Sequence, residues 1–390
     1  MPSPFQSLPV PAPDPIFAIM TEAVAAGTKA INCTIGVVMD EDGQTTLLPS
    51  VQRAINDVME DLKHQRFGYP PLLGVPAFRS SVERLIFGEK HPYTVASIAS
   101  TGGTGALAIN LRLMAMLLQS KRILLPSPAW ANHPPPCVAA GLAVIEVPYL
   151  ENSIPTVQPL IEQLKKEKGD VGLLLQAGSH NPTGIDLENE QWADLVRAIK
   201  EKGNCIVLLD CAYQGLKHGV EKDVAMVHLF LRENIPTLVT WSAAKNHSIY
   251  ALRPGLACAV VPDATTKSSV EGHYSRITRS IHSASSTVGQ LVVARVQEHY
   301  KEEWLDDLKQ VRTTLARKRK AMIELIPATC KAALRGFGMF AMLPLTQEQI
   351  LRLKNEHNVF MTLDGRINIA GIPDARIGEF CAKVRKVVGS

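Results

Sequence analysis

The sequence lacks the features that mark membrane-spanning, secreted and nucleic-acid-binding proteins. It contains no run of about 18 apolar residues, and its N-terminus has no charged segment followed by an apolar core, which disfavours a membrane span and a signal peptide. The 41 basic and 37 acidic residues leave a net charge of only +4, with no dense basic run joined to aromatic residues. We therefore expect neither a nucleic acid nor a membrane as a partner.

The sequence also has no paired cysteine motif. Its seven cysteines form no CxxC pair and their number is odd, so we expect buried thiols in a reduced, cytoplasmic compartment and no metal site. Residues 1–15 carry six prolines, which exclude a helix or a central strand there and predict an extended arm on a surface, the chain's own or a neighbour's. Beyond this arm there is no internal repeat or low-complexity tract.

What remains is the pattern of an ordinary α/β protein of 390 residues, long enough for a large domain and a smaller one. Apolar runs that alternate with helical patterns predict a mostly parallel sheet covered on both faces, with ligands at the carboxyl ends of its strands. From about residue 303 a long charged helix, short strands and a closing helix predict the smaller domain. The expected strands are 95–99, 122–125, 143–147, 171–176, 205–209, 237–241 and 256–261, and the expected helices include 106–119, 157–167, 188–202 and 303–325.

Lys245 follows the apolar run 235–239 and is flanked by small residues. A lysine at the end of a buried strand can be desolvated and made nucleophilic, as a Schiff base with an aldehyde cofactor requires. Arg253, eight residues on, could then take a phosphate of that cofactor. The alternative is a solvated loop lysine.

Two segments that follow predicted strands each allow two interpretations. In 100–107 the glycines would let backbone N–H groups surround an anion, and the N-terminus of the following helix would favour a phosphate. The alternative is that this segment only connects a strand to a helix. In 126–133 Trp130 offers a face for stacking on an aromatic ring and His133 an adjustable hydrogen-bond partner, or Trp130 closes the edge of the core.

Three more segments carry polar groups at the ends of apolar runs. Residues 180–184 form a turn in which Asn181 could donate to a ring oxygen. Asp210 needs a cationic partner such as a protonated pyridine nitrogen, with Tyr213 near the ring's phenolic oxygen, unless it caps a helix. Arg366 suits bidentate capture of a carboxylate, unless it forms a surface salt bridge. A dinucleotide site is disfavoured because the GxGxxG spacing is absent.

Taken in this order, the segments resemble those of the aspartate and aromatic amino-acid aminotransferases, the class I branch of the fold-type I enzymes that use pyridoxal 5'-phosphate. The resemblance covers nearly the whole chain, from 12–15 to 366–371. It implies an α/β fold with a large domain at 46–302 that binds the cofactor, a small α/β domain at 16–45 and 303–390, and an arm at 1–15. It also implies a homodimer with shared active sites, and amino acids and 2-oxo acids as small-molecule partners.

The resemblance assigns catalytic roles to residues of this chain. Lys245 corresponds to the lysine that binds the cofactor covalently and then moves a proton on the substrate as general base. Asp210 corresponds to the aspartate that keeps the pyridine nitrogen protonated, with His133 behind it. Tyr213 and Asn181 correspond to the pair that hydrogen-bond the ring oxygen.

The remaining cofactor contacts are also implied by the resemblance. The residues that correspond to a phosphate cradle are Gly103, Thr104, Ser242 and Arg253. Trp130 corresponds to a ring that stacks on the cofactor. Tyr69, in 67–70, corresponds to a tyrosine that reaches the phosphate in the neighbouring subunit.

Substrate recognition follows from the same resemblance. Arg366 corresponds to the arginine that grips the α-carboxylate, and Gly36 to the backbone that closes over it. Trp130 and Asn181 line the substrate side as well. Arg279, which lies 34 residues after Lys245 in the sequence, corresponds to the arginine that binds the distal carboxylate of aspartate, glutamate and their keto acids.

Several residues depart from the family pattern. Ala244 replaces a usual serine, which removes one phosphate hydrogen bond and weakens cofactor binding by about 1 kcal/mol. Pro254 and residues 283–286 differ as well. Because Val38 and Met39 make the mouth of the substrate pocket more apolar, we hypothesise broad specificity that covers aromatic as well as acidic amino acids.

Two other functions remain as alternatives. A carbon–sulfur lyase or decarboxylase of the same fold would keep the cofactor and change the reaction, but such enzymes seldom need the second carboxylate clamp that Arg279 offers. A non-catalytic ligand sensor would attach this fold to a DNA-binding domain, but only the proline-rich arm precedes the fold.

Overall fold

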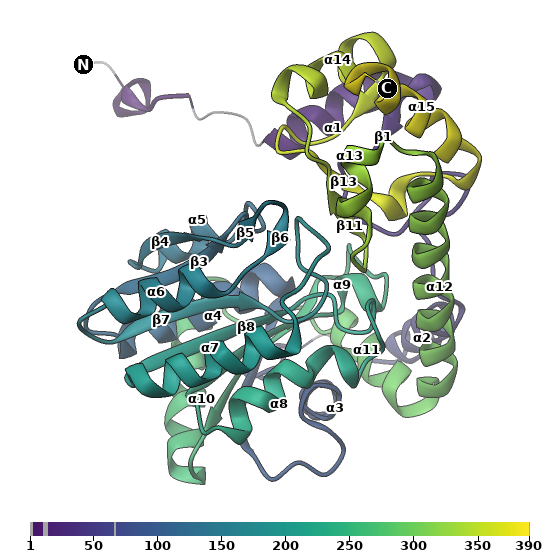
Figure 1. Cartoon of the computed structure of the whole chain (residues 1–390). Coiled ribbons are helices and arrows are strands. Elements are labelled where there is room, and N and C mark those ends of the chain that lie inside the picture. Colours follow the sequence, from purple (N-terminus) through teal and green to yellow (C-terminus); the bar gives the residue numbers. More distant parts are fainter. Residues whose placement is uncertain (1–2, 11–14, 66–67, 390) are drawn as a thin grey trace.

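The computed structural model describes residues 3–10, 15–65 and 68–389 (Figure 1). At its centre is a seven-stranded sheet in the order β2-β10-β9-β8-β7-β3-β4. All neighbours are parallel except β10, which is antiparallel to both β2 and β9. The strands are β2 (Thr94–Thr101), β3 (Arg122–Ser127), β4 (Ala143–Pro148), β7 (Val171–Gln176), β8 (Cys205–Cys211), β9 (Thr237–Ser242) and β10 (Pro254–Val261).

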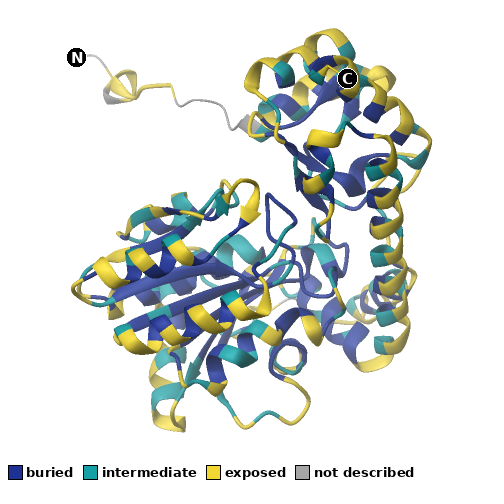
Figure 2. Ribbon diagram, viewed as in Figure 1, coloured by how far each residue is buried: buried dark blue, intermediate teal, exposed yellow. Residues whose placement is uncertain are grey.

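The apolar runs form strands because helices cover both faces of the sheet. Leu173 and Leu175 of β7 pack on one side with α6, α7 and α8, whereas Leu174 packs on the other side with α4 and α10. The central strands β7 and β9 are accordingly buried along their length, whereas only one residue of the edge strand β4 is buried (Figure 2). The helices of this part are α2 (Pro49–Leu62), α3 (Pro76–Phe87), α4 (Gly102–Leu117), α5 (Pro134–Ala139), α6 (Gln158–Lys166), α7 (Asn189–Lys202), α8 (Ala225–Arg232), α9 (Ala243–Asn246), α10 (Ala264–Arg279) and α11 (Val288–His299), with the 3-10 turn η3 (Lys222–Val224) and the small pair β5 (Leu150–Glu151) and β6 (Ile154–Pro155).

A second hydrophobic core joins the C-terminal elements to a short N-terminal strand. There β1 (Ile31–Asn32) pairs parallel with β12 (Val359–Phe360), and β11 (Phe340–Met342) pairs antiparallel with β13 (Arg366–Asn368). The helices around them are α1 (Pro15–Ala25), α12 (Lys301–Leu325), α13 (Ala328–Lys331), α14 (Gln347–His357) and α15 (Ile377–Val388), with the 3-10 turns η2 (Gly27–Lys29), η4 (Ala332–Leu334), η5 (Ile369–Gly371) and η6 (Asp374–Arg376).

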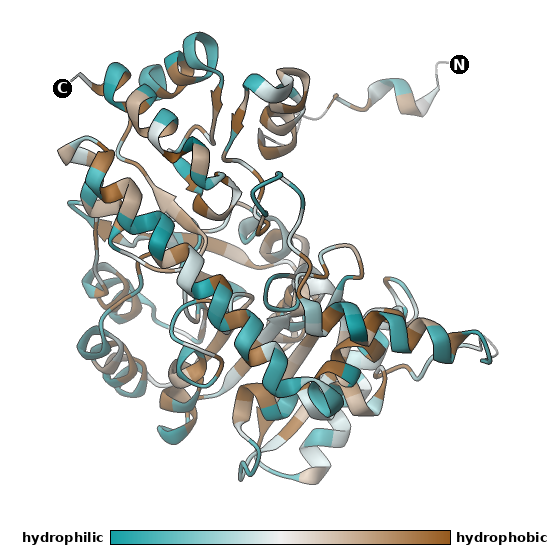
Figure 3. Cartoon of the chain, turned by 90° about the vertical axis from the view of Figure 1, so that its right-hand side faces the viewer, coloured by the Kyte–Doolittle hydropathy of each residue, from teal (hydrophilic) through white to brown (hydrophobic). Residues whose placement is uncertain are grey.

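The long helix α12 spans both cores. Trp304, Leu308 and Leu315 pack in the core around the sheet, whereas Met322 packs in the second core. The helix crosses the front of Figure 3, where its outer surface is mostly hydrophilic. The separate cores support two domains, and we retain the boundaries expected at 16–45, 46–302 and 303–390 as a proposal.

The N-terminal arm differs in part from the expectation of fully extended chain. Residues Pro4–Ser7 form a 3-10 helix, η1, whose N-cap Ser3 accepts a hydrogen bond from the backbone N–H of Phe5. Pro4 fits because a proline at the first helical position loses no hydrogen bond. Part of the predicted arm, 1–2 and 11–14, lies outside the described residues. The described residues 3–10 stand clear of the rest of the chain (Figures 1 and 3).

Candidate active site

A pocket of about 180 Å³ opens at the carboxyl ends of β7, β8 and β9, where ligands of parallel sheets collect. The first turn of α4, the loop after β3 and the residues just before β10 complete its wall. Eight of the ten lining residues were singled out from the sequence. The lining residues are Gly103, Thr104, Trp130, Gln176, Asp210, Ala212, Tyr213, Ser242, Lys245 and Arg253.

Lys245 projects into this pocket from the four-residue helix α9, which Ser242 caps by accepting the N–H of Ala244 at 3.2 Å. Its ammonium nitrogen lies 5.7 Å from the ring centre of Tyr213 and 5.8 Å from that of Tyr250. Burial, reinforced by the Arg253 charge, lowers the pKa of Lys245 to about 8. The side chain is thus not a solvated loop lysine, and a substantial neutral fraction is present near pH 8.

Asp210 lies at the end of β8 and is buried with His133. The Nε2 atom of His133 and the Oδ2 atom of Asp210 are 3.0 Å apart, and the Ala212 N–H donates to Oδ1 at 3.2 Å. The ring of Trp130 meets that of His133 edge to face at 5.3 Å. The alternative in which Asp210 caps a helix is wrong, because turns follow the strand and the next helical element is η3. A buried carboxylate is therefore directed at the pocket.

Tyr213 and Asn181 meet beside Asp210. The Nδ2 atom of Asn181 donates to the Tyr213 hydroxyl at 2.9 Å, and Asn181 Oδ1 is buried with no hydrogen-bond partner among the described residues. Burial, followed by the nearby Asp210 charge, raises the pKa of Tyr213. The phenol is protonated at neutral pH and can donate a hydrogen bond to a ligand oxygen.

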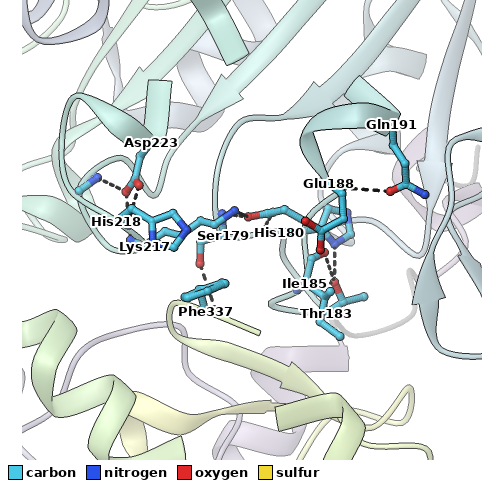
Figure 4. Close-up of polar contacts among 12 residues, drawn as sticks. Ser179, His180, Thr183, Ile185, Glu188, Gln191, Lys217, His218, Asp223 and Phe337 are labelled. Atoms are coloured by element: carbon cyan, nitrogen blue, oxygen red, sulfur yellow. Dashed lines mark hydrogen bonds and ion pairs between the residues drawn. The ribbon is translucent and has the colours of Figure 1, made fainter. Parts of the chain in front are cut away.

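The loop that carries Asn181 is fixed from several sides. Asp186 accepts the backbone N–H groups of Ser179 and His180 at 2.9 and 2.8 Å, and it also pairs with Lys217 at 2.7 Å. Figure 4 shows His180 beside Thr183, which its Nδ1 atom contacts at 2.9 Å, and Ser179 directed at the backbone of Phe337. This loop is held rigidly rather than being a free turn.

The N-terminus of α4 forms a concave, positively polarised surface. Gly102 has φ +67°, and a Cβ atom there would lie 2.3 Å from the guanidinium of Arg253. A Cβ on Gly103 would lie 3.1 Å from that of Ser242. Arg253 has no ion pair among the described residues. Glycine thus lets the helix N-terminus approach an uncompensated arginine and a serine hydroxyl, an arrangement suited to a phosphate rather than a plain connection.

Arg366 lies on β13 and does not line the pocket, but its charge acts on Tyr213, which does. Its side chain is buried, so the surface salt-bridge alternative is wrong. Its Nη2 atom donates to the Thr34 carbonyl at 2.9 Å, its guanidinium lies 5.1 Å from the ring centre of Phe340, and its Nε is buried with no partner among the described residues. A Cβ atom on Gly36 would lie 3.1 Å from the same Phe340 ring, so Arg366 and Gly36, both predicted to bind the substrate, lie next to Phe340.

Tyr69 and Arg279 lie outside the pocket of their own chain. Tyr69 is 98% exposed, and Arg279 is exposed at the C-terminal end of α10. Phe67, in the same predicted segment as Tyr69, lies outside the described residues. The role expected for Tyr69, at the phosphate of a neighbouring subunit, and that expected for Arg279, at the distal carboxylate of the substrate, stay predictions.

Sequence reasoning missed several residues around the pocket. The Gln176 side chain accepts the N–H of Asn181 at 3.0 Å and donates to its carbonyl at 2.8 Å. A polar residue that ends the apolar strand 171–176 was the available signal. Phe340 meets the ring of Tyr213 edge to face at 5.8 Å, yet nothing in its local sequence marks it.

His247, two residues after Lys245, predicts a dependence of stability on pH. It is fully buried, stacks on Trp304 at 4.7 Å, and burial lowers its pKa to about 3. Between pH 6.5 and about 3, His247 is protonated in the unfolded chain but stays neutral in the folded chain. The free energy of unfolding therefore falls by up to about 1.4 kcal/mol for each pH unit of acidification in this range. His247→Phe should flatten the plot of unfolding free energy against pH by that slope, measured by urea unfolding.

The control for this experiment is His64→Phe, since His64 is exposed and its loss should leave the slope unchanged. The lost contact of His247 Nδ1 with Asn246, at 2.8 Å, shifts the whole plot without changing its slope. Equal slopes for wild type and His247→Phe would show that His247 does not titrate between the two states.

Comparisons with known proteins match the whole chain. The family described as "Aminotransferase class I and II" matches residues 28–384. The aspartate aminotransferase of Pseudomonas aeruginosa is 32% identical, covering 98% of this chain and 99% of its own. The aromatic-amino-acid aminotransferase of Paracoccus denitrificans is 32% identical, covering 94% of this chain and 95% of its own.

Solved structures agree with these relatives. The aromatic-amino-acid aminotransferase from Burkholderia pseudomallei, covalently bound to pyridoxal phosphate, is similar with a TM-score of 0.93 at 27% identity, covering 99% of both chains. The cytoplasmic aspartate aminotransferase of Saccharomyces cerevisiae is similar with a TM-score of 0.93 at 28% identity, covering 99% of this chain and 98% of that one. The predicted fold class and resemblance are confirmed, and the chain belongs to the class I and II aminotransferases.

Proposed function

We propose that this protein is a pyridoxal-phosphate-dependent aminotransferase that moves an amino group between aspartate or aromatic amino acids and 2-oxoglutarate by a ping-pong mechanism. The observation that carries the proposal is the convergence on one pocket of a lysine whose pKa is lowered, a buried carboxylate and an anion cradle. The family and relatives support the reaction. No finding favours the lyase, decarboxylase or sensor alternatives.

The residues of the pocket fit pyridoxal 5'-phosphate. The α4 N-terminus and the Gly102 turn leave space for a phosphate beside Arg253. A Cβ atom on Gly102 would fill that space. Asp210 would face a ring nitrogen, while the Tyr213 hydroxyl and the second N–H of the Asn181 Nδ2 amide group would face a ring oxygen. When bound, the cofactor supplies an aldehyde for amines and a ring that withdraws electrons.

Each side chain then has a defined task. Lys245 would hold the cofactor through its aldehyde group, and once the substrate amine has taken its place, the freed Lys245 Nζ would take up and return the proton of the substrate α-carbon. The Asp210 carboxylate, oriented by His133, would hold a proton on the ring nitrogen. Trp130 would stack against the ring, and the Tyr213 hydroxyl would donate to its oxygen. The phosphate contacts are those of Gly103, Thr104, Ser242 and Arg253.

The substrate is held through its carboxylates. Arg366 binds the α-carboxylate beside Gly36, on the side that Trp130 and Asn181 also face. Its guanidinium is buried and forms no ion pair among the described residues, so a substrate carboxylate would supply the missing partner. Arg279 binds a distal carboxylate in the site of a neighbouring subunit.

We also propose a homodimer in a cytoplasmic setting. Neither Tyr69 nor Arg279 lines the pocket of its own chain, and both are exposed, which supports a site that a second copy completes. Phe5, Leu8 and Val10 of the arm are exposed apolar residues that suit packing on a neighbour. All seven cysteines are free and buried, and none of the described helices is both long and apolar enough to cross a bilayer. Sedimentation at twice the 42.5 kDa chain mass is expected.

The experiment that tests the function follows visible absorbance of the purified protein loaded with pyridoxal phosphate. A single amino donor, without keto acid, should bleach the band, and 2-oxoglutarate should restore it. A lyase or decarboxylase would turn over the donor without a requirement for keto acid, and a sensor would bind without releasing product. Absence of a band after loading would contradict the proposal.

Arg279→Leu tests recognition of the distal carboxylate. Losing a charge-assisted bond should cost dicarboxylate turnover about 2–3 kcal/mol, roughly 30- to 150-fold in kcat/KM, with little effect on aromatic donors. Arg276→Leu, an exposed arginine one turn earlier on α10, is the control. Equal losses on aspartate and phenylalanine would show that Arg279 does not read the side chain. If wild type turned over aspartate but neither phenylalanine nor tyrosine, the hypothesis of broad specificity would be wrong.

A further inference from the structure

The segment 33–39, here called the strap, connects Arg366 to the loop that follows Lys245 and α9. On strand β13, Arg366 donates to the Thr34 carbonyl at 2.9 Å and Asn368 donates to the Val37 carbonyl at 2.7 Å. At the other end, the Val38 N–H donates to the Tyr250 hydroxyl at 2.9 Å. The strap is therefore hydrogen-bonded both to Arg366 and to a residue five positions after Lys245.

Tyr250 makes the link to the lysine loop. It follows Lys245 by five residues, and its ring centre lies 5.8 Å from the lysine Nζ. Burial raises the pKa of Tyr250 to about 12, so the hydroxyl stays protonated, with a lone pair for the Val38 N–H. Among the described residues, this is the single hydrogen bond between the strap and the loop after β9. Ser248 adds a contact just beyond the strap, to the Thr46 carbonyl.

The strap contains the wall that faces the substrate carboxylate. Gly36 packs against Phe340, whose ring also contacts Arg366 and Tyr213. The strap's other hydrogen bonds include that of the Met39 N–H with the Ala370 carbonyl at 3.2 Å and that of the Val38 carbonyl with the Thr46 N–H at 2.9 Å. Without Tyr250, the strap would keep its hydrogen bonds to Arg366, Asn368 and Ala370 but would lose its hydrogen bond to the loop that follows Lys245.

We propose that Tyr250 is a positioning residue that, through the Val38 N–H, holds the strap at the distance from Lys245 that a bound amino acid requires. The inference rests on the proposed function. Tyr250 touches no reacting atom in this role and acts through the backbone of the strap. Its removal should weaken capture of the substrate and leave the cofactor contacts intact.

Tyr250→Phe deletes only the hydroxyl. KM for amino donors should rise roughly 3- to 10-fold, the effect of one lost hydrogen bond, while kcat and the visible band of the loaded enzyme stay unchanged. The matched control is Tyr274→Phe, which removes a fully buried hydroxyl bonded to Asn110 at 2.6 Å; neither of these two residues lines the pocket, so KM should stay unchanged. A wild-type KM in Tyr250→Phe would overturn the proposal.

The hydrogen bond between the Val38 N–H and the Tyr250 hydroxyl, here called the tether, can be tested by hydrogen exchange at the Val38 amide, without a measurement of enzyme activity. Exchange should speed up several-fold in Tyr250→Phe and not in Tyr274→Phe. If no amino acid is turned over, the proposed function fails while this readout still decides whether the tether exists. Unchanged exchange at Val38 would refute the tether, and faster exchange with an unchanged KM would refute its positioning role.

Discussion

Lys245→Ala is expected to abolish transamination, by roughly 10⁴-fold or more, while the protein stays folded and still binds pyridoxal phosphate non-covalently. Lys245 supplies both the attacking amine and the proton carrier, and no other lysine lines the pocket among the described residues. The rest of the pocket is unchanged by the substitution, because Arg253, Ser242 and the α4 N-terminus hold the phosphate from other elements. Half-reactions followed by absorbance measure the loss.

Two further observations separate this outcome from general damage. Lys165→Ala, an exposed lysine near the end of α6, should behave as wild type. The cofactor should dialyse away from Lys245→Ala and remain with the control, because only the covalent attachment is lost. Substantial activity in Lys245→Ala would remove the central assignment.

The parts of the fold that the sequence predicted are those in which local pattern and tertiary burial agree. Strands such as 171–176 and 237–241 are mostly apolar and fully buried, so their location could be predicted without knowledge of the strands beside them. Boundaries were less certain: the helix expected at 106–119 begins at Gly102, since glycine there serves the anion cradle rather than ending the helix. The 3-10 turn at Pro4–Ser7 was not predicted, because the prediction of an extended arm rested only on the high proline content of residues 1–15.

The candidate site was predictable where a polar group follows an apolar strand. Lys245, Asp210 and Asn181 carry that signal, and the structure brings all three to one edge of the sheet. Phe340 and Tyr250 carry no such signal, because their importance comes from contacts with residues far away in the sequence: Phe340 with Gly36, and Tyr250 with Val38. Contacts of this kind arise only when the two cores meet.

Asp210→Asn is expected to slow both half-reactions about 10²- to 10³-fold, the range for removing one preorganised electrostatic contact. The amide has nearly the shape of the carboxylate and can still accept from His133 Nε2, so the side chain should stay in place. What is lost is the negative charge that holds a proton on the ring nitrogen. Without that proton, the bound ring withdraws electrons poorly, and proton removal by Lys245 slows even though Lys245 itself is intact.

The design of this test separates charge from structure. Thermal stability should not fall, because a buried carboxylate that faces the pocket gives way to a neutral group whose burial costs less. His133→Ala keeps the charge and removes its orienting partner, so its loss of rate should be smaller than that of Asp210→Asn. If the two variants lost rate equally, placement of the carboxylate rather than its charge would govern the reaction; wild-type rates in Asp210→Asn would exclude Asp210 as the partner of the ring nitrogen.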